Sequence, residues 1–151
     1  MVAGVRGYTN RVPTLISTGT DTMLWCCTLE RQALMSLALT ILFAEDDMPV
    51  RASIAQALSL RGFRVLVAEN GYEALRLLTQ ESVDVLFTDI IMPGLDGVEL
   101  ARRAKRLRPE LKVLFATGYA SKASKAPHLG KVLYKPLRAH EIDAELRALA
   151  A

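Results

Sequence analysis

Short apolar runs of strand length alternate along this chain with segments in which apolar residues recur every three or four positions. The first pattern is typical of buried strands, and the second is the period of a helix with one buried face. The predicted strands are residues 40–45, 64–68, 83–88, 112–116 and 131–134. Strands that alternate with helices predict an α/β fold with a parallel sheet, in which the nearly uninterrupted run 83–88 is central.

Proline, glycine and asparagine mark the expected ends of the helices. Pro49 suits an early position in the first helix, which ends near Gly62, and Asn70 opens the second helix. The third helix stops before Pro109, because the residue that precedes a proline is disfavoured in the α conformation. A final helix follows Pro136.

The segment at residues 118–130, between the fourth and fifth strands, is the weakest part of this pattern. It is short, rich in small residues and interrupted by Pro127. We expect a fourth helix of about two turns, from Ser121 to Ala126, that is short or frayed, because short helices are marginal without an apolar face. Elevated mobility is predicted here.

Residues 1–34 show no lasting apolar period, and Thr, Gly, Ser and Asn are scattered through them. Residues 1–37 are therefore predicted to be a disordered or weakly ordered extension of a single domain at 38–151. Two explanations stay open. Either the true start lies near Met35, or residues 23–29 form a short recruitment peptide.

Composition bounds the class of protein. At 151 residues, with 51% apolar and 23% charged residues, the chain fits one globular domain. A net charge of +3 is too weak to indicate a nucleic-acid partner. The longest uncharged stretch near the start, 32–44, is too short to span a membrane, and no secretory signal is found. Adjacent Cys26 and Cys27 fit neither a metal site nor a disulfide framework, which favours a reducing, cytoplasmic setting.

Two further groups of polar residues are interpreted as surface. His128 and His140 fall on a loop and on the last helix, and are not expected to bind metal or carry phosphate. A basic run on the third helix is expected to be a solvated face without interleaved aromatics. Its members are Arg102, Arg103, Lys105, Arg106 and Arg108.

Carboxylates follow two of the predicted strands. Glu45, Asp46 and Asp47 end the first strand, and Asp89 ends the third. The carboxyl ends of parallel strands share one edge of the sheet, where such folds bind ligands. Carboxylates that lie close together stay ionised only if a cation sits between them, so a small hard metal, Mg²⁺, is predicted.

Two more polar groups follow the next strands in order, namely Thr117 after the fourth and Lys135-Pro136 after the fifth. With the acids, this set resembles the receiver domain of bacterial two-component response regulators, over residues 38–150. The run Ile-Ile-Met-Pro-Gly-Leu-Asp-Gly after Asp89 is similar to the receiver loop. Lys135-Pro136 is similar to the family's Lys-Pro step, in which a cis bond places the amine in the site.

The resemblance implies a flavodoxin-like doubly wound (βα)5 fold with strand order 2-1-3-4-5. It also implies a protein that is not an enzyme. Its partners would be a histidine kinase or phosphotransfer protein and a downstream protein target, without direct contact to nucleic acid or membrane. The predicted function is that of a single-domain response regulator, which acts by phosphorylation-dependent partner binding or phosphorelay.

In this interpretation Asp89 is the phosphoacceptor, because a carboxylate forms an acyl phosphate when the charge on the transferring oxygens is neutralised. Lys135 supplies a positive charge and Thr117 a hydrogen bond. The expected metal ligands are Asp46, Asp89 and the backbone carbonyl of Ile91, with Glu45 holding a bound water. A strand shifted by one residue would instead pair Asp46 with Asp47, and both registers stay open.

Two features depart from the family pattern. The run 115–119, Phe-Ala-Thr-Gly-Tyr, resembles a subgroup known beside certain alphaproteobacterial sensor kinases, but Lys112-Val113 stands where that subgroup has Pro-Phe. Many receivers also have an aromatic switch residue three positions before the lysine, where this chain has Val132. Segment 118–130 is then expected to order or shift instead. Tyr119 or Tyr134 either takes over the switch role or covers the sheet edge.

Two other functions are weighed against the phosphoacceptor. A phosphohydrolase of the haloacid dehalogenase type also uses an aspartate nucleophile and Mg²⁺, but it needs a second Asp where Ile91 stands. A receiver-fold module that binds partners without phosphorylation fits the missing aromatic at Val132, although the full set of acids, Thr117 and Lys135 favours phosphorylation.

Overall fold

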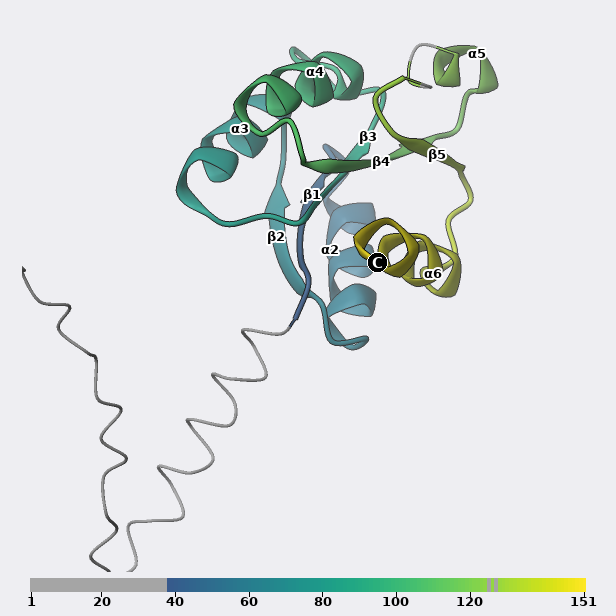
Figure 1. Cartoon of the computed structure of the whole chain (residues 1–151). Helices are drawn as coiled ribbons and strands as arrows, with labels where there is room; N and C mark the ends of the chain where they lie inside the picture. Colours follow the sequence, from purple (N-terminus) through teal and green to yellow (C-terminus); the bar gives the residue numbers. More distant parts are fainter. Residues whose placement is uncertain (1–37, 125, 127) are drawn as a thin grey trace, which may run out of the picture. The chain divides into compact units, whose positions relative to one another are not determined.

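A five-stranded parallel sheet is the centre of the computed structural model, which describes residues 38–124, 126 and 128–151 (Figure 1). The strand order is β2-β1-β3-β4-β5. The strands are β1 Thr40–Ala44, β2 Arg64–Ala68, β3 Val85–Asp89, β4 Lys112–Thr117 and β5 Lys131–Tyr134. The predicted α/β class and the 2-1-3-4-5 order are both confirmed.

Helices cover both faces of the sheet. They are α2 Met48–Ser59, α3 Gly71–Gln80, α4 Gly97–Leu107, α5 Ala120–Ala123 and α6 Ala139–Ala150. The helices α3 and α4 pack on one face, and α2 and α6 pack on the other (Figure 1). Each connection from one parallel strand to the next contains a helix, as is usual for crossovers in a parallel sheet.

The two central strands explain why the sequence shows continuous apolar runs. All five residues of β1 and all five of β3 are buried, because helices cover both faces of the sheet. Phe43 and Phe87 lie on one face, where their rings stack with centroids 4.7 Å apart. Leu42 and Leu86 face the other helical layer. Successive side chains thus enter opposite halves of the core.

Three helices begin with side-chain caps at the carboxyl edge of the sheet. Asp47, Asn70 and Asp96 each accept a backbone hydrogen bond from the first turn of the helix that follows, α2, α3 and α4 respectively. Gly62, with φ of +89°, follows α2 in a conformation that suits glycine. The predicted helix ends near Pro49, Gly62, Asn70 and Pro109 are confirmed, whereas the caps Asp47 and Asp96 were not predicted.

Several predicted boundaries differ from the structure. The first strand ends at Ala44 instead of residue 45, and the fourth ends at Thr117 instead of residue 116. The third strand begins at Val85 instead of residue 83, since the Asp84 carboxylate accepts a hydrogen bond from Thr40 N (2.8 Å) outside the ladder. Asp89 itself belongs to that strand. The fourth helix is a single turn, Ala120–Ala123, which is shorter than the expected 121–126 and lacks a side-chain cap.

The proposed extension at residues 1–37 lies outside the described residues, and so do the predictions about Met35, residues 23–29, Cys26 and Cys27. Within the part of the chain that is described, no helix is both long and apolar enough to cross a membrane.

Candidate phosphoacceptor site

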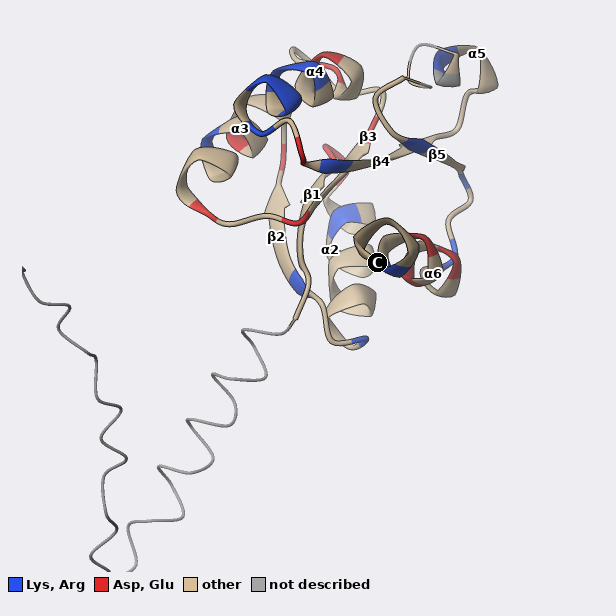
Figure 2. Cartoon of the chain, viewed as in Figure 1, with Lys and Arg blue, Asp and Glu red and all other residues tan. Residues whose placement is uncertain are grey.

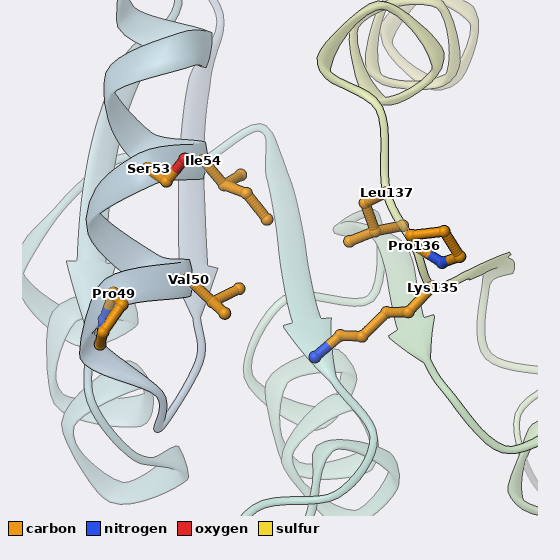
Figure 3. Close-up of a pocket in the computed structure, with 7 residues that line it drawn as sticks. All are labelled: Pro49, Val50, Ser53, Ile54, Lys135, Pro136 and Leu137. Carbon is orange, nitrogen blue, oxygen red and sulfur yellow. The ribbon is translucent and has the colours of Figure 1, made fainter.

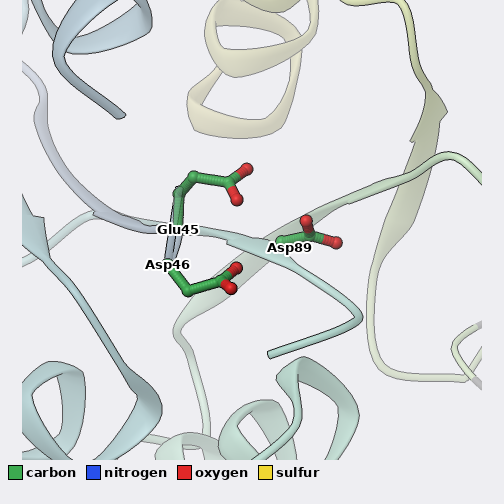
Figure 4. Close-up of side chains that lie close together, drawn as sticks. All are labelled: Glu45, Asp46 and Asp89. Carbon is green, nitrogen blue, oxygen red and sulfur yellow. The ribbon is translucent and has the colours of Figure 1, made fainter. Parts of the chain in front are cut away.

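Three carboxylates from two neighbouring strands converge at the carboxyl edge of the sheet. Residue Ala44 of β1 pairs with Thr88 of β3, so Glu45 and Asp89, which come next, lie side by side. Together with Asp46, each offers one oxygen, and these oxygens all lie within 4.8 Å of one another (Figure 4). The structure thus brings together the three acids that were predicted to form the metal site, Glu45 through a bound water.

These acids differ in their access to solvent. Glu45 is 1% exposed and Asp89 is 7% exposed, whereas Asp46 is an exposed residue. A buried carboxylate is stable in its charged form only if it is paired or hydrogen-bonded. Asp46 therefore forms the solvent-exposed side of the cluster.

Lys135 is the cation that pairs with the buried acids. Its Nζ lies 2.7 Å from Asp89 Oδ2 and 2.9 Å from Glu45 Oε2. The backbone positions it, since Lys135 N donates to Thr117 O at 2.8 Å and the bond to Pro136 is cis, as the resemblance implied. The two acids and the lysine therefore form one ion-paired cluster.

Burial raises the pKa of Glu45, and ion pairing raises the pKa of Lys135. Burial raises the pKa of Glu45 above its usual value of 4.5, and the neighbouring Asp89 adds to this, while the hydrogen bond from Lys135 opposes it. Burial disfavours the charged form of Lys135, but its hydrogen bonds to Asp89 and Glu45 prevail and raise its pKa above 10.5. Lys135 is therefore firmly cationic at neutral pH.

Asp47, the third acid of the triplet, has a different place. Its Oδ1 accepts a hydrogen bond from Val50 N at 3.0 Å, which makes it the N-cap of α2. It is absent from the cluster of acids, which contains Glu45 and Asp46. This geometry favours the register in which Glu45 and Asp46 are the acid pair.

Arg51 is a site residue that the sequence did not indicate. Its Nη1 donates to the backbone carbonyls of Glu45 at 2.6 Å and of Asp46 at 3.2 Å. The guanidinium thereby ties the first turn of α2 to the acidic loop. Nothing in the local pattern marks this arginine, because its partners are backbone atoms that any residue supplies.

Thr117 ends β4 beside the cluster, but its hydroxyl is engaged elsewhere. Tyr119 N donates to Thr117 Oγ1 at 3.0 Å, and Oγ1 donates to Tyr119 O at 3.2 Å. The side chain is fully buried. In this state the hydroxyl secures the residue that precedes α5 and makes no hydrogen bond to Asp89.

Ile91 lies in the loop after β3, at the rim of the site. Its backbone N–H donates to Asp89 Oδ1 at 3.0 Å, and its side chain is 43% exposed. Both oxygens of Asp89 therefore accept hydrogen bonds, one from Ile91 and the other from Lys135.

A groove next to the cluster separates α2 from the segment that begins at Lys135. It has a volume of about 430 Å³, and the Lys135 side chain forms part of its wall (Figure 3). The other lining residues are mainly apolar: Pro49, Val50, Ser53, Ile54, Pro136 and Leu137. The phosphoacceptor region thus borders an apolar surface.

Among the described residues, neither the two histidines nor the basic run on α4 forms an ion pair with these acids. His128 and His140 are exposed. Of the basic run on α4, Arg102, Arg103 and Arg106 are exposed, as expected of a solvated face.

The structure combines an acid pair, a strand-end aspartate and a lysine joined to a cis proline on a parallel sheet of order 2-1-3-4-5, which is the arrangement of a receiver domain. The model of the response regulator receiver domain matches residues 41–147, and the chain belongs to this family. Membership confirms the predicted resemblance and the prediction of a signalling receiver that is not an enzyme.

Similar proteins include curated response regulators and solved receivers. The response regulator receiver protein CpdR of Brucella abortus is 42% identical over 113 residues, which are 72% of this chain and 94% of CpdR. A receiver from Clostridium thermocellum has a TM-score of 0.70 at 27% identity, with 74% of this chain and 94% of that chain covered. The receiver of the hybrid histidine kinase CckA has a TM-score of 0.65 at 32% identity, over 74% and 99% of the two chains.

Proposed function

We propose that Asp89 accepts a phosphoryl group from a phosphohistidine of a histidine kinase or phosphotransfer protein, and that the phosphorylated form binds a protein partner or passes the group on. The observation that carries this proposal is the ion pair between Asp89 and Lys135, 2.7 Å apart, inside the cluster of acids. The similarity to CpdR and to a receiver of a hybrid kinase supports it.

The chemistry is a transfer between two covalent carriers. A carboxylate oxygen of Asp89 forms a bond to phosphorus as the N–P bond of phosphohistidine breaks, and the electron pair of that bond stays with the imidazole nitrogen. The product is an acyl phosphate. Lys135 offers its charge to the phosphoryl oxygens, and the N–H of Ile91 keeps the Asp89 side chain in place.

The donor set fits Mg²⁺. Three carboxylate oxygens within 4.8 Å are the ligands that a small hard cation prefers. Asp46, Asp89 and the backbone carbonyl of Ile91 would hold the ion, and Glu45 would hold a water of its shell. Mg²⁺, when bound, supplies positive charge that offsets the negative charge of the transferring phosphoryl group.

Thr117 connects phosphorylation to the start of α5. We infer that its hydroxyl turns from Tyr119 toward a phosphoryl oxygen on Asp89, which removes both of its hydrogen bonds to the Tyr119 backbone. The helix α5 has one turn and no side-chain cap, so this loss falls on a weakly held element. The signal would be read at this segment, in place of an aromatic switch at Val132.

The test is phosphorylation with a small donor. Acetyl phosphate and Mg²⁺ should add one phosphoryl group to the wild type, seen by intact mass, and Asp89→Asn should abolish the addition. Asp143→Asn, which changes an acid on α6, is the matched control and should be labelled like the wild type. A wild type that stays unmodified would overturn the proposal.

A receiver-fold module that binds partners without phosphorylation is the second candidate. It is favoured by Val132, which is aliphatic, half-buried and packed against the core. Tyr119 and Tyr134 are 64% and 57% exposed, so neither fills a switch pocket in this state. Partner binding that is unchanged in Asp89→Ala would favour this candidate over phosphorylation-dependent signalling.

A further inference from the structure

A groove between α3 and α4 combines an apolar floor with a basic rim. It has a volume of about 460 Å³. Leu107 in its lining is 56% exposed, so part of the apolar surface of the groove is accessible to solvent. The lining residues are Leu75, Arg76 and Thr79 of α3 and Arg103, Arg106 and Leu107 of α4. Figure 2 shows these two helices side by side, with several basic residues on α4.

The charge in this groove has one sign. Three arginines line it, and no acid does. Arg103 is paired with Glu99 at 2.9 Å, and Arg76 lies 3.9 Å from Glu73, both one turn back on their own helices. Arg106 takes part in no ion pair among the residues that the structure describes. The rim is therefore positively charged beyond what its own acids balance.

We propose that the α3–α4 groove docks an acidic amphipathic segment of a partner protein. Apolar side chains of that segment would cover Leu75 and Leu107, and its carboxylates would pair with Arg76, Arg103 and Arg106. Arginine suits this role because its stem packs against apolar groups while its guanidinium binds carboxylates through two hydrogen bonds. The groove uses residues separate from the phosphoacceptor cluster, so the proposal goes beyond the proposed function.

The chain's own first 37 residues do not have the required charge. They contain Arg6, Arg11 and Arg31 but only two acids, Asp21 and Glu30, so they are slightly basic. Like charges would oppose their docking on three arginines. An acidic segment from another protein has the complementary charge.

Nucleic acid fits this groove less well than an acidic protein segment. A phosphate backbone would pair with the arginines, but the floor is formed by two leucines and the lining has no aromatic side chain on which a base could stack. An amphipathic helix buries such an apolar floor with its own apolar face.

The experiment is a titration of the ¹⁵N-labelled full chain followed by NMR. The probe is a synthetic amphipathic peptide with leucines at helical spacing and glutamates elsewhere, and its control has lysines in place of the glutamates. The acidic peptide should produce saturable shifts at the amides of the six lining residues. The lysine peptide should not.

Matched variants test the charged and the apolar contributions of the groove separately. Arg106→Glu should weaken the peptide about fivefold or more, whereas Arg102→Glu, an exposed arginine on the same helix outside the groove, should change it less than about twofold. Leu107→Gln should weaken binding, and Leu60→Gln, at an 81% exposed leucine of another element, should not.

Four results would overturn the proposal. They are the absence of saturable shifts, equal binding of the lysine peptide, an oligonucleotide that binds the same amides as tightly, and self-association that Arg106→Glu removes. The outcome is separable from the phosphoacceptor proposal, because Asp89→Asn should bind the peptide normally and Arg106→Glu should still be labelled by acetyl phosphate.

Discussion

Gly97, the first residue of α4, lies directly against the backbone carbonyl of Asp89. A methyl group at Gly97 would lie 2.0 Å from the Asp89 carbonyl oxygen, 2.9 Å from its carbon and 3.0 Å from Ile90 Cα. Gly97 N also donates to Ile90 O at 2.9 Å. The start of α4 therefore braces the end of β3, and this close approach requires glycine.

Gly97→Ala should consequently displace the backbone of Asp89. The backbone atoms it would meet cannot rotate away, so either α4 or the end of β3 must shift, at a cost of about 1–3 kcal/mol. We expect a lower Tm by thermal unfolding and slower labelling by acetyl phosphate at a temperature where the variant is folded. Gly118→Ala is the control, since no atom lies within 4 Å of its added methyl group. Equal behaviour of the two variants would contradict the bracing role.

The neighbouring residues Asp46 and Asp47 give a second prediction, because one is a proposed Mg²⁺ ligand and the other caps α2. Asp47→Ala removes the cap of α2 and should lower the free energy of unfolding by about 1 kcal/mol, while Mg²⁺ binding stays near the wild-type value. Asp46→Ala removes a proposed ligand and should abolish Mg²⁺ binding with little loss of stability, since the residue is exposed. Calorimetric titration and thermal unfolding of both variants measure this. Loss of Mg²⁺ binding in both variants would assign the acid pair to Asp46 and Asp47.

The sequence predicted the fold well because its signals are local and repeated. Central strands such as β1 and β3 are buried on both faces, so they appear as unbroken apolar runs. Once the strands are parallel, residues that end them must share one edge, which brings Glu45, Asp46 and Asp89 together. Lys135 joins them at the end of β5.

Contacts that depend on tertiary packing could not be predicted in this way. Arg51 binds backbone carbonyls, and Gly97 meets a backbone carbonyl across a loop, so neither has a partner side chain that a pattern would reveal. The length of α5 was overestimated for a related reason. The length of a short helix depends on packing and capping. The residue before α5, Tyr119, provides no side-chain cap.

The hydroxyl of Thr117 gives a third prediction. Thr117→Val keeps the shape but removes both hydrogen bonds to Tyr119, and should speed amide hydrogen exchange at Tyr119. Thr117→Ser keeps the hydroxyl and should restore protection. Beryllofluoride, which mimics the phosphoryl group on Asp89, should speed the same exchange in the wild type. Unchanged exchange at Tyr119 on addition of beryllofluoride would argue against Thr117 as the connection to α5.

Removal of the site cation gives a fourth prediction. Lys135→Met leaves Asp89 and the buried Glu45 without their shared partner and should cost about 1–3 kcal/mol, less than a fully buried pair because Lys135 is partly exposed. Mg²⁺ should then raise the Tm of this variant more than that of the wild type, since the ion supplies the missing charge. Lys131→Met, on the strand that precedes Lys135, is the control, because Lys131 pairs with Glu145 at the surface. Equal Mg²⁺ responses of Lys135→Met and the wild type would contradict the shared site.

The raised pKa of Glu45 gives a prediction for pH. Below 4.5 the carboxyl is protonated in both the folded and the unfolded state, so it contributes no pH dependence. As the pH rises from 4.5 through the raised folded pKa, ionisation is costlier in the folded state, and the wild type loses stability from this group. In metal-free buffer, Glu45→Gln should therefore gain stability relative to the wild type across that window.

Glu99→Gln supplies a control of opposite sign, because the hydrogen bond from Arg103 lowers the pKa of Glu99. Its ionised form favours the folded state, so the wild type gains stability from this group as the pH rises to 4.5 and above, and Glu99→Gln should lose it. Chemical unfolding of the three proteins from about pH 3 to pH 8 measures both trends. Mg²⁺ should reverse the advantage of Glu45→Gln, since a bound cation favours the ionised carboxylate. A flat difference between Glu45→Gln and the wild type over this range would show that burial of Glu45 imposes no cost on the folded state.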